Sequence, residues 1–219
     1  MSDDAQLPLQ ADELAVRAAG GDKAAWVALM DAHRARLRRI VAMRLDPRLS
    51  GVVDPSDVIQ ETFAELHVKL PEYVAAPSLN FFVWLRYLTA DTLSRLHRRH
   101  LGVQARDASR TLHAGQFTGG MPEASSIVLS KLITAKDSEA IHEAIRSERR
   151  ARVASALDDL TLEDREVLVL RHFEGLSAAE TALVLGISES ASRKRYLRAL
   201  ERFTQLLQGL PGGLGGFIS

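Results

Sequence analysis

The segment Thr161–Leu207, TLEDREVLVLRHFEGLSAAETALVLGISESASRKRYLRALERFTQLL, contains three helix-start signals in close succession. Two of them have the spacing of a capping box, a hydroxyl residue followed three positions later by an acidic residue: Thr161 with Asp164, and Ser177 with Glu180. Ser188 is a candidate cap for the third helix. Gly175 and Gly186 interrupt the apolar periodicity, as glycine does after the end of a helix. The segment therefore predicts three consecutive helices, the last running from 189 to about 207.

The second and third of these helices, with the glycine turn between them, have the pattern of a helix-turn-helix motif. Such a motif presents the N-terminal part of its second helix to base edges in the major groove of DNA. Polar and mostly cationic side chains stand there and are the candidates for DNA contact: Ser190, Arg193, Lys194, Arg195 and Arg198. Arginine can form two hydrogen bonds with one guanine, whereas lysine and the outlying arginines suit phosphates. A three-helix packing unit with a solvated cationic face is the alternative interpretation, and spacing alone leaves it open.

The opposite side of the third helix is apolar. Tyr196, Leu200, Phe203 and Leu207 recur at three- and four-residue steps, and we expect them to pack inward. Ser192 departs from the pattern because it stands where such motifs usually bury a branched apolar residue. A serine hydroxyl in a helix can bond to a backbone carbonyl one turn earlier.

Composition narrows the function classes. The chain of 219 residues has no cysteine, which excludes disulfides, thiolate nucleophiles and cysteine-based zinc sites. We find no glycine-rich phosphate loop, paired catalytic carboxylates or metal-ligand cluster, and therefore expect no enzyme and no cofactor or metal. The N-terminus has no apolar run behind it, and no segment approaches the roughly 20 apolar residues that span a bilayer. We expect a cytoplasmic, nucleoid-associated protein without membrane insertion. The formal net charge of the chain is zero, but cationic residues are concentrated on the last helix.

Two helices are expected in the first part of the chain. A short one runs from Ala11 to Ala19, after ten residues that we expect to be disordered. A longer amphipathic one follows Asp22, a good N-cap. His33 lies on its apolar side, and we expect it to be a packed core residue rather than a ligand.

A third helix begins at Asp54 and Pro55, which suit the N-cap and the first helical position. One side of it carries acidic and polar residues at three- and four-residue steps, here called the acidic stripe: Asp57, Gln60, Glu61 and Glu65. Acidic residues in a first turn suit the helix dipole, but the stripe continues beyond that turn. A basic surface on a partner would explain the remainder.

A helix rich in aromatic residues follows an expected loop over 71–80, with Asn80 or Ser78 as its cap. Its pattern suggests that Phe82, Arg86 and Tyr87 cannot all face the core together with the other apolar residues. Exposed aromatic rings among cations suit single-stranded bases, because rings stack on bases while cations hold the backbone. The alternative is that all these aromatic residues belong to the core.

The sequence thus predicts an all-α protein with two small helical domains joined by a flexible linker, the second domain ending in the helix-turn-helix. Changes in glycine, proline and serine content place the boundaries. They give an N-terminal domain over 11–101, a linker over 102–136 that includes one short helix, a C-terminal domain over 137–207 and a loose tail over 208–219.

These features together resemble bacterial RNA polymerase sigma factors of the extracytoplasmic-function group. The motifs that carry the resemblance are DPSDVIQETF at 54–63, FFVWLR at 81–86 and LTLEDREVLVLR at 160–171, followed by the helix-turn-helix. Their order and spacing are specific in combination, and the resemblance covers nearly everything from about residue 12 to residue 207.

The resemblance implies a role for each surface. Asp57, Gln60 and Glu61 would dock on the β′ clamp helices of core RNA polymerase, which the chain would also contact through the β subunit. The aromatic helix and the loop before it would melt promoter DNA near −10 and hold non-template bases through Asn80, Trp84, Arg86, Tyr87 and Arg95. The helix-turn-helix would recognise the element near −35 through the five candidates named above. The linker would thread toward the polymerase active-site channel, and an anti-sigma factor or another regulator is a further candidate partner.

Two departures and one alternative accompany this interpretation. The linker is longer than in many such proteins, and Asp91 stands where a neutral polar residue is common. The alternative is a stand-alone helix-turn-helix transcriptional regulator that does not bind polymerase. Such regulators usually pair the DNA-binding motif with a sensor or dimerisation domain. The sequence does not resemble the α/β receiver of response regulators, and the acidic stripe would have no role in such a protein.

Overall fold

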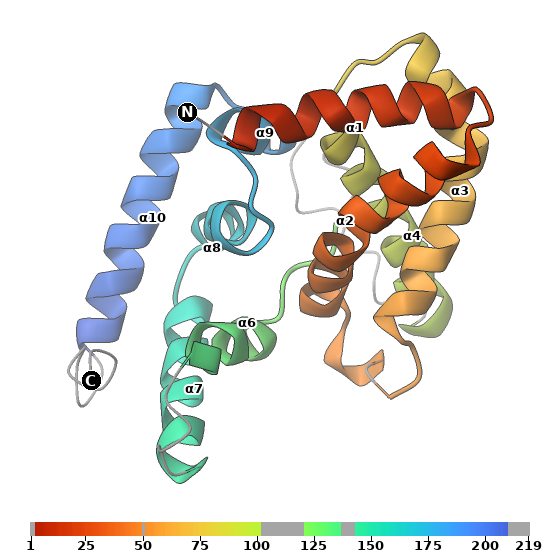
Figure 1. Cartoon of the computed structure of the whole chain (residues 1–219). Helices are drawn as coiled ribbons and strands as arrows, with labels where there is room; N and C mark the ends of the chain where they lie inside the picture. Colours follow the sequence, from red (N-terminus) through yellow and green to blue (C-terminus); the bar gives the residue numbers. More distant parts are fainter. Residues whose placement is uncertain (1–2, 50, 102–120, 137–142, 210–219) are drawn as a thin grey trace. The chain divides into compact units, whose positions relative to one another are not determined.

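The computed structural model describes residues 3–49, 51–101, 121–136 and 143–209, and every regular element in these ranges is helical (Figure 1). The chain divides into two compact units, residues 1–122 and 123–219. The all-α prediction, with a C-terminal helix-turn-helix, is therefore confirmed for the part of the chain that the structure describes. In chain order the elements are α1 Asp3–Ala19, α2 Lys23–Arg44, η1 Pro47–Leu49, α3 Pro55–Ala75, α4 Phe81–Leu101, α6 Ser126–Ile133, η3 Thr134–Lys136, α7 Glu143–Asp158, α8 Leu162–Leu168, η4 Val169–Phe173, α9 Ala178–Leu185 and α10 Glu189–Gly209.

Helices α1 and α2 form an antiparallel pair around a glycine turn in the first unit. Gly21 has a φ of 91°, a value that an L side chain rarely adopts. Asp22 caps α2 as predicted, because its carboxylate accepts from the backbone N–H groups of Ala24 and Ala25 at 2.9 and 3.0 Å. The start of α1 differs from the prediction, since the helix begins at Asp3 within the ten residues that we expected to be disordered.

Helix α3 begins as predicted, with the Asp54 carboxylate accepting from the Ser56 N–H at 2.7 Å. The predicted loop over 71–80 is wrong in its first half, because α3 continues through Pro71 to Ala75. The physical reason lies two residues beyond Pro71, where Tyr73 is buried and packs edge-on to Phe81 with the ring centroids 5.8 Å apart. The proline ring itself is exposed, so it displaces no packing inside the unit.

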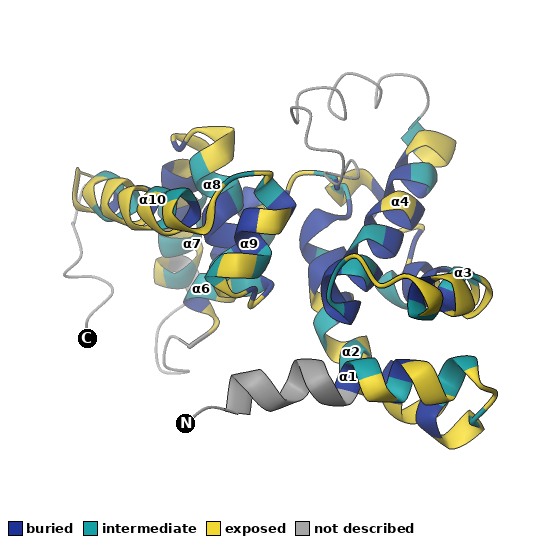
Figure 2. Ribbon diagram, turned by 90° about the horizontal axis from the view of Figure 1, so that it is seen from above, coloured by how far each residue is buried: buried dark blue, intermediate teal, exposed yellow. Residues whose placement is uncertain are grey.

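Helix α4 lies at the centre of the first unit and contacts α1, α2 and α3. Its buried residues occupy most of its circumference (Figure 2). Of the three residues that were not expected to face the core together, Phe82 is buried and Arg86 is 2% exposed, whereas Tyr87 is half-buried. Neighbours on several sides leave α4 only a narrow exposed or half-buried stripe, which is formed by Trp84, Tyr87, Asp91, Arg95 and Arg98. Periodicity alone could not show how narrow this stripe is.

His33 is a packed core histidine, as predicted. Its ring lies 5.3 Å from the ring of Phe81 and 5.6 Å from that of Phe82. Burial, and secondarily the charge of Arg36, lower the pKa of His33 from 6.5 to about 4. The folded state therefore favours the neutral ring.

We expect His33 to make the stability of the protein depend on pH. The unfolded chain binds a proton below about pH 6.5 while the folded chain does not, so stability should fall as the pH drops from 6.5 to about 4. The total loss from this group is up to about 3 kcal/mol. Urea unfolding across this range should show a shallower dependence for His33→Leu, whereas replacing the exposed His100 by Gln should leave the wild-type dependence. An equal slope in His33→Leu would assign the pH effect to other groups.

In the second unit, α6 packs against α7, and Arg165 of α8 contacts residues of both helices. Its guanidinium group donates to the Ser126 hydroxyl at 2.9 Å and to the Asp158 carboxylate at 3.0 Å, and it pairs with Glu123 at 3.2 Å. The 102–136 segment that we assigned to a linker thus ends in a packed helix that belongs to the second unit. Residues 102–120 of that segment lie outside the described residues.

The helix-turn-helix consists of α9, a tight turn and α10. Ser177 and Glu180 form the predicted capping box, with reciprocal hydrogen bonds of 3.1 and 2.7 Å. Gly186 adopts a φ of 64°, which explains the glycine in the turn. The Ser188 hydroxyl accepts from the Ala191 N–H at 3.2 Å and so caps α10. The motif predicted from the sequence is therefore present in the structure.

One expectation for α10 is wrong. Leu200 is exposed rather than packed inward, and the most deeply buried side of the helix is formed by Ser192 and Ala199. The Ser192 hydroxyl is buried without a hydrogen-bond partner, so it does not bond to a carbonyl one turn earlier. The small side chains at these positions let α10 approach its neighbours closely.

We expect Ser192→Ala to raise the free energy of unfolding by about 1 kcal/mol. The substitution removes a buried hydroxyl that has lost its water partners, and alanine has the higher helix propensity. Ser155→Ala on α7 is the matched control, because that serine is exposed and the same gain in propensity comes without the burial effect. Urea denaturation should separate the two, and an equal or smaller gain for Ser192→Ala would contradict the assignment.

Candidate nucleic-acid interface

The first half of the acidic stripe lies at the surface of α3. Asp57 and Gln60 are exposed, and the Glu61 side chain is 39% exposed. Val58 and Ile59, which alternate with them along the helix, are buried. The stripe is therefore the solvent side of an amphipathic helix whose other side belongs to the core.

The second half of the stripe is paired inside the chain. The Arg95 guanidinium group on α4 lies 2.6 Å from a carboxylate oxygen of Glu65 and 3.7 Å from one of Glu61, and it also pairs with Asp91. Lys69 approaches Glu65 at 2.5 Å. Part of the stripe thus has basic partners within the unit, whereas we expected a basic partner on another protein.

This cluster also explains Asp91, the acidic residue at a position where a neutral one was expected. Hydrogen bonding to Glu65 raises the pKa of Arg95, and burial of Glu65 is outweighed by hydrogen bonds from Lys69 and Arg95, which lower the pKa of Glu65. Arg95 was a candidate for DNA contact near −10. Its charge is matched by three carboxylates, so its position indicates a link between α3 and α4 instead.

The other −10 candidates lie in the first half of α4. The Asn80 side chain accepts from the Val83 N–H at 2.8 Å and so caps the helix. The half-buried Trp84 ring stacks on the Tyr73 ring, with centroids 4.4 Å apart and planes at 18°. Tyr87 is half-buried. Arg86, in contrast, is buried, so its side chain is not available to DNA in this conformation.

The −35 candidates are divided between two sides of α10. Ser190, Arg193, Lys194 and Arg198 are exposed, and the Arg193 guanidinium group pairs with Glu189 one turn earlier. Leu197 is 62% exposed and follows Arg193 and Lys194 at four- and three-residue steps. Leu197 is not among the residues predicted from the sequence to contact DNA, although this spacing places it on their side of the helix.

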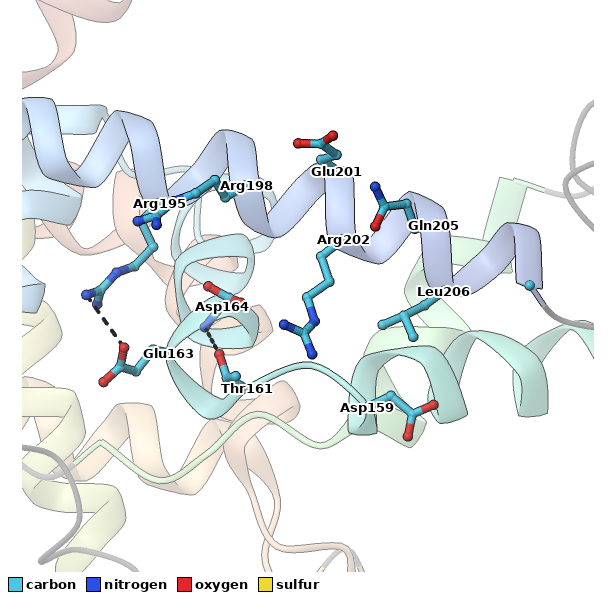
Figure 3. Close-up of a pocket in the computed structure, with 11 residues that line it drawn as sticks. Asp159, Thr161, Glu163, Asp164, Arg195, Arg198, Glu201, Arg202, Gln205 and Leu206 are labelled. Carbon is cyan, nitrogen blue, oxygen red and sulfur yellow. Dashed lines mark hydrogen bonds and ion pairs between the residues drawn. The ribbon is translucent and has the colours of Figure 1, made fainter.

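Arg195 points away from that surface, into a groove between α10 and the start of α8 (Figure 3). It lies 3.5 Å from a carboxylate oxygen of Glu163. The groove has a volume of about 1080 Å³, and Arg198 and Arg202 also line it, together with acidic residues. Its mixed charge does not select one class of ligand. Arg195 and Arg198 therefore lie behind the N-terminal end of α10, which would enter the DNA groove, and not at that end itself.

The part of the chain that the structure describes holds no group of three or more His, Cys, Asp or Glu residues arranged for a metal ion. Within the same part, no helix has the length and apolar character needed to cross a membrane.

Comparison with known proteins identifies the C-terminal segment first. Residues 150–203 match the family model described as Sigma-70, region 4. The match covers α8, α9 and most of α10, and so includes the whole helix-turn-helix.

Curated relatives extend the similarity along the chain. RNA polymerase sigma factor NccH of Alcaligenes xylosoxydans xylosoxydans is 28% identical over 203 residues, covering 90% of this chain and 94% of NccH. RNA polymerase sigma factor CnrH of Cupriavidus metallidurans is 29% identical over 203 residues, covering 91% of this chain and 96% of CnrH. The solved structure of CnrH in complex with the cytosolic domain of CnrY superposes with a TM-score of 0.54 at 25% identity, over 90% of this chain. Both units therefore take part in the similarity.

Proposed function

This chain is an RNA polymerase sigma factor of the extracytoplasmic-function type, and we propose that its two units divide promoter recognition between them. Sigma factors direct RNA polymerase to promoters and are not enzymes, so the polymerase supplies the chemistry. In this division the first unit holds polymerase and captures the melted strand near −10. The second unit binds duplex DNA near −35.

The polymerase-binding surface that we propose consists of Asp57, Gln60 and Glu61, which would dock on the β′ clamp helices. Its support is exposure on a helix whose opposite side is firmly buried, so that the acidic groups are presented on a rigid scaffold. A negative surface of this kind favours a basic partner and speeds its association.

The strand-capturing surface that we propose consists of Asn80, Trp84 and Tyr87. The half-buried Trp84 and Tyr87 rings support base stacking, because each keeps an accessible part while the rest is held by the core. Arg86 and Arg95 are left out of this proposal, since the first is buried and the second is paired with acidic residues.

The duplex-binding surface that we propose lies on the first turns of α10. Ser190, Arg193 and Lys194 would contact base edges and phosphates in the major groove, with Arg195 and Arg198 beside them as phosphate contacts. This assignment is supported by the exposure of the first three and by the location of the segment within the region 4 match.

A regulator that binds the chain is also part of the proposal. CnrH has been solved with the cytosolic domain of CnrY, and it is 29% identical to this chain over nearly the full length of both. A partner that holds the chain away from polymerase would have to occupy or distort the surfaces named above.

One observation supports the proposal most strongly. The first unit has an exposed acidic surface on α3, and the second unit has a cationic recognition helix, α10. Gel filtration of the full chain with core RNA polymerase tests it. We expect the two to comigrate at micromolar concentration, with and without DNA. Migration of the chain at its own volume in the presence of core enzyme would favour the stand-alone regulator instead.

A further inference from the structure

Tyr73 occupies a junction between α1, α3 and the loop that enters α4. Its ring is 8% exposed and stacks on the half-buried ring of Trp84. Its hydroxyl oxygen lies 2.9 Å from the backbone carbonyl oxygen of Leu79 and 3.2 Å from a carboxylate oxygen of Asp12. One side chain thus contacts both the strand-capturing helix and the residue that precedes its cap, Asn80.

The short loop from Ala76 to Ser78 is exposed. At the start of the loop, the Ala76 N–H donates to backbone carbonyl groups of α3. After its end, Asn80 caps α4 and the Tyr73 hydroxyl group donates to the Leu79 carbonyl. A loop that must present bases to a pocket needs its end fixed, because loosely held segments sample many conformations and bind more weakly.

We propose that Tyr73 is a positioning residue for capture of the non-template strand, acting through Leu79 and Trp84 and resting on the proposed role of α4. It would not contact DNA itself. The hydroxyl group fixes the end of the loop, and the ring fixes the plane of Trp84, so that the stacking surface and the loop keep one relative geometry.

The two hydroxyl contacts are not equivalent. A phenol carries one proton, and both neighbours are acceptors, so donation to Leu79 and donation to Asp12 compete. Burial, and then the Asp12 charge, raise the pKa of Tyr73, so the proton is present at neutral pH. Removing Asp12 should therefore leave the bond to Leu79 in place or strengthen it, whereas removing the hydroxyl group abolishes it.

This competition gives an experiment with matched variants. Tyr73→Phe removes the hydroxyl and keeps the ring, Asp12→Ala removes the competing acceptor, and Tyr196→Phe removes a hydroxyl that contacts His172 at 2.8 Å in the second unit. Each variant would be assembled with core polymerase. Fluorescence anisotropy would then measure binding to two probes from a promoter that the holoenzyme transcribes: a single-stranded oligonucleotide of the non-template −10 region and a duplex of the −35 region.

We expect Tyr73→Phe to weaken binding of the single strand about two- to tenfold, the effect of losing one hydrogen bond, and to leave duplex binding unchanged. Asp12→Ala and Tyr196→Phe should bind the single strand as the wild type does. Wild-type affinity in Tyr73→Phe, or an equal loss in Tyr196→Phe, would overturn the inference. Failure of the wild-type holoenzyme to bind the single strand would instead reject the proposed role of α4 on which the inference rests.

Discussion

Replacing both Asp57 and Glu61 by arginine is expected to abolish binding to core RNA polymerase while leaving binding to duplex DNA intact. The two side chains stand one turn apart on the exposed side of α3. Their reversal would set like charges against a basic docking surface, which costs several kcal/mol and corresponds to a loss of affinity of more than about a hundredfold. Titration of labelled core enzyme with the variant would measure the loss.

The control must carry the same change of charge elsewhere. Asp31→Arg with Glu13→Arg serves, because both residues are exposed and lie on α2 and α1 rather than on α3. Glu61 also approaches Arg95, so the double variant could lose stability through that cluster. Asp57→Arg alone leaves the cluster untouched and should still weaken binding at least tenfold. Unchanged affinity in the single and double variants would refute the docking surface.

Replacing Arg193 by alanine is expected to relax sequence selectivity upstream of the start site. The side chain is exposed on the first turns of α10, where its only described partner is Glu189 on the same helix. A guanidinium group that bonds one guanine through two hydrogen bonds contributes roughly 1–3 kcal/mol of discrimination at that base pair. Competition between promoter duplexes that differ at single positions would locate the effect.

Two variants separate base contact from charge. Lys194→Ala should weaken all duplexes to a similar degree and reduce the slope of log affinity against log salt by about one, as the loss of a phosphate contact does. Arg202→Ala removes one charge from the groove side of the same helix and should change selectivity at no position. Selectivity that stays intact in Arg193→Ala would move base recognition to another residue.

The helix ends could be predicted from the sequence because capping depends on residues close together in the chain. Asp22, Asp54 and Asn80 all accept backbone hydrogen bonds at the start of the helix that each was expected to cap. Gly186 has the positive φ that a turn between α9 and α10 requires. Local chemistry sufficed at each of these positions.

The sequence was less informative where residues distant in the chain determine the surroundings of a side chain. Arg86 follows an exposed pattern on an isolated helix, but α4 is central to its unit and buries it. Arg95 was a candidate for contact with DNA near −10, but in the structure a carboxylate oxygen of Glu65, thirty positions earlier, lies 2.6 Å from it. The hydrogen bond from Tyr73 to Leu79 could not be predicted either, because the expected loop over 71–80 placed Tyr73 outside any helix. Such pairings come from the packing of helices distant in sequence.

The central claim is that this one chain both holds polymerase and selects the DNA on which it starts. Run-off transcription with purified core RNA polymerase and a pool of genomic fragments measures this directly. With the chain present, we predict transcripts whose 5′ ends map downstream of one shared pair of sequence elements, and with core enzyme alone we predict none of these ends. Identical transcripts with and without the chain would contradict the account.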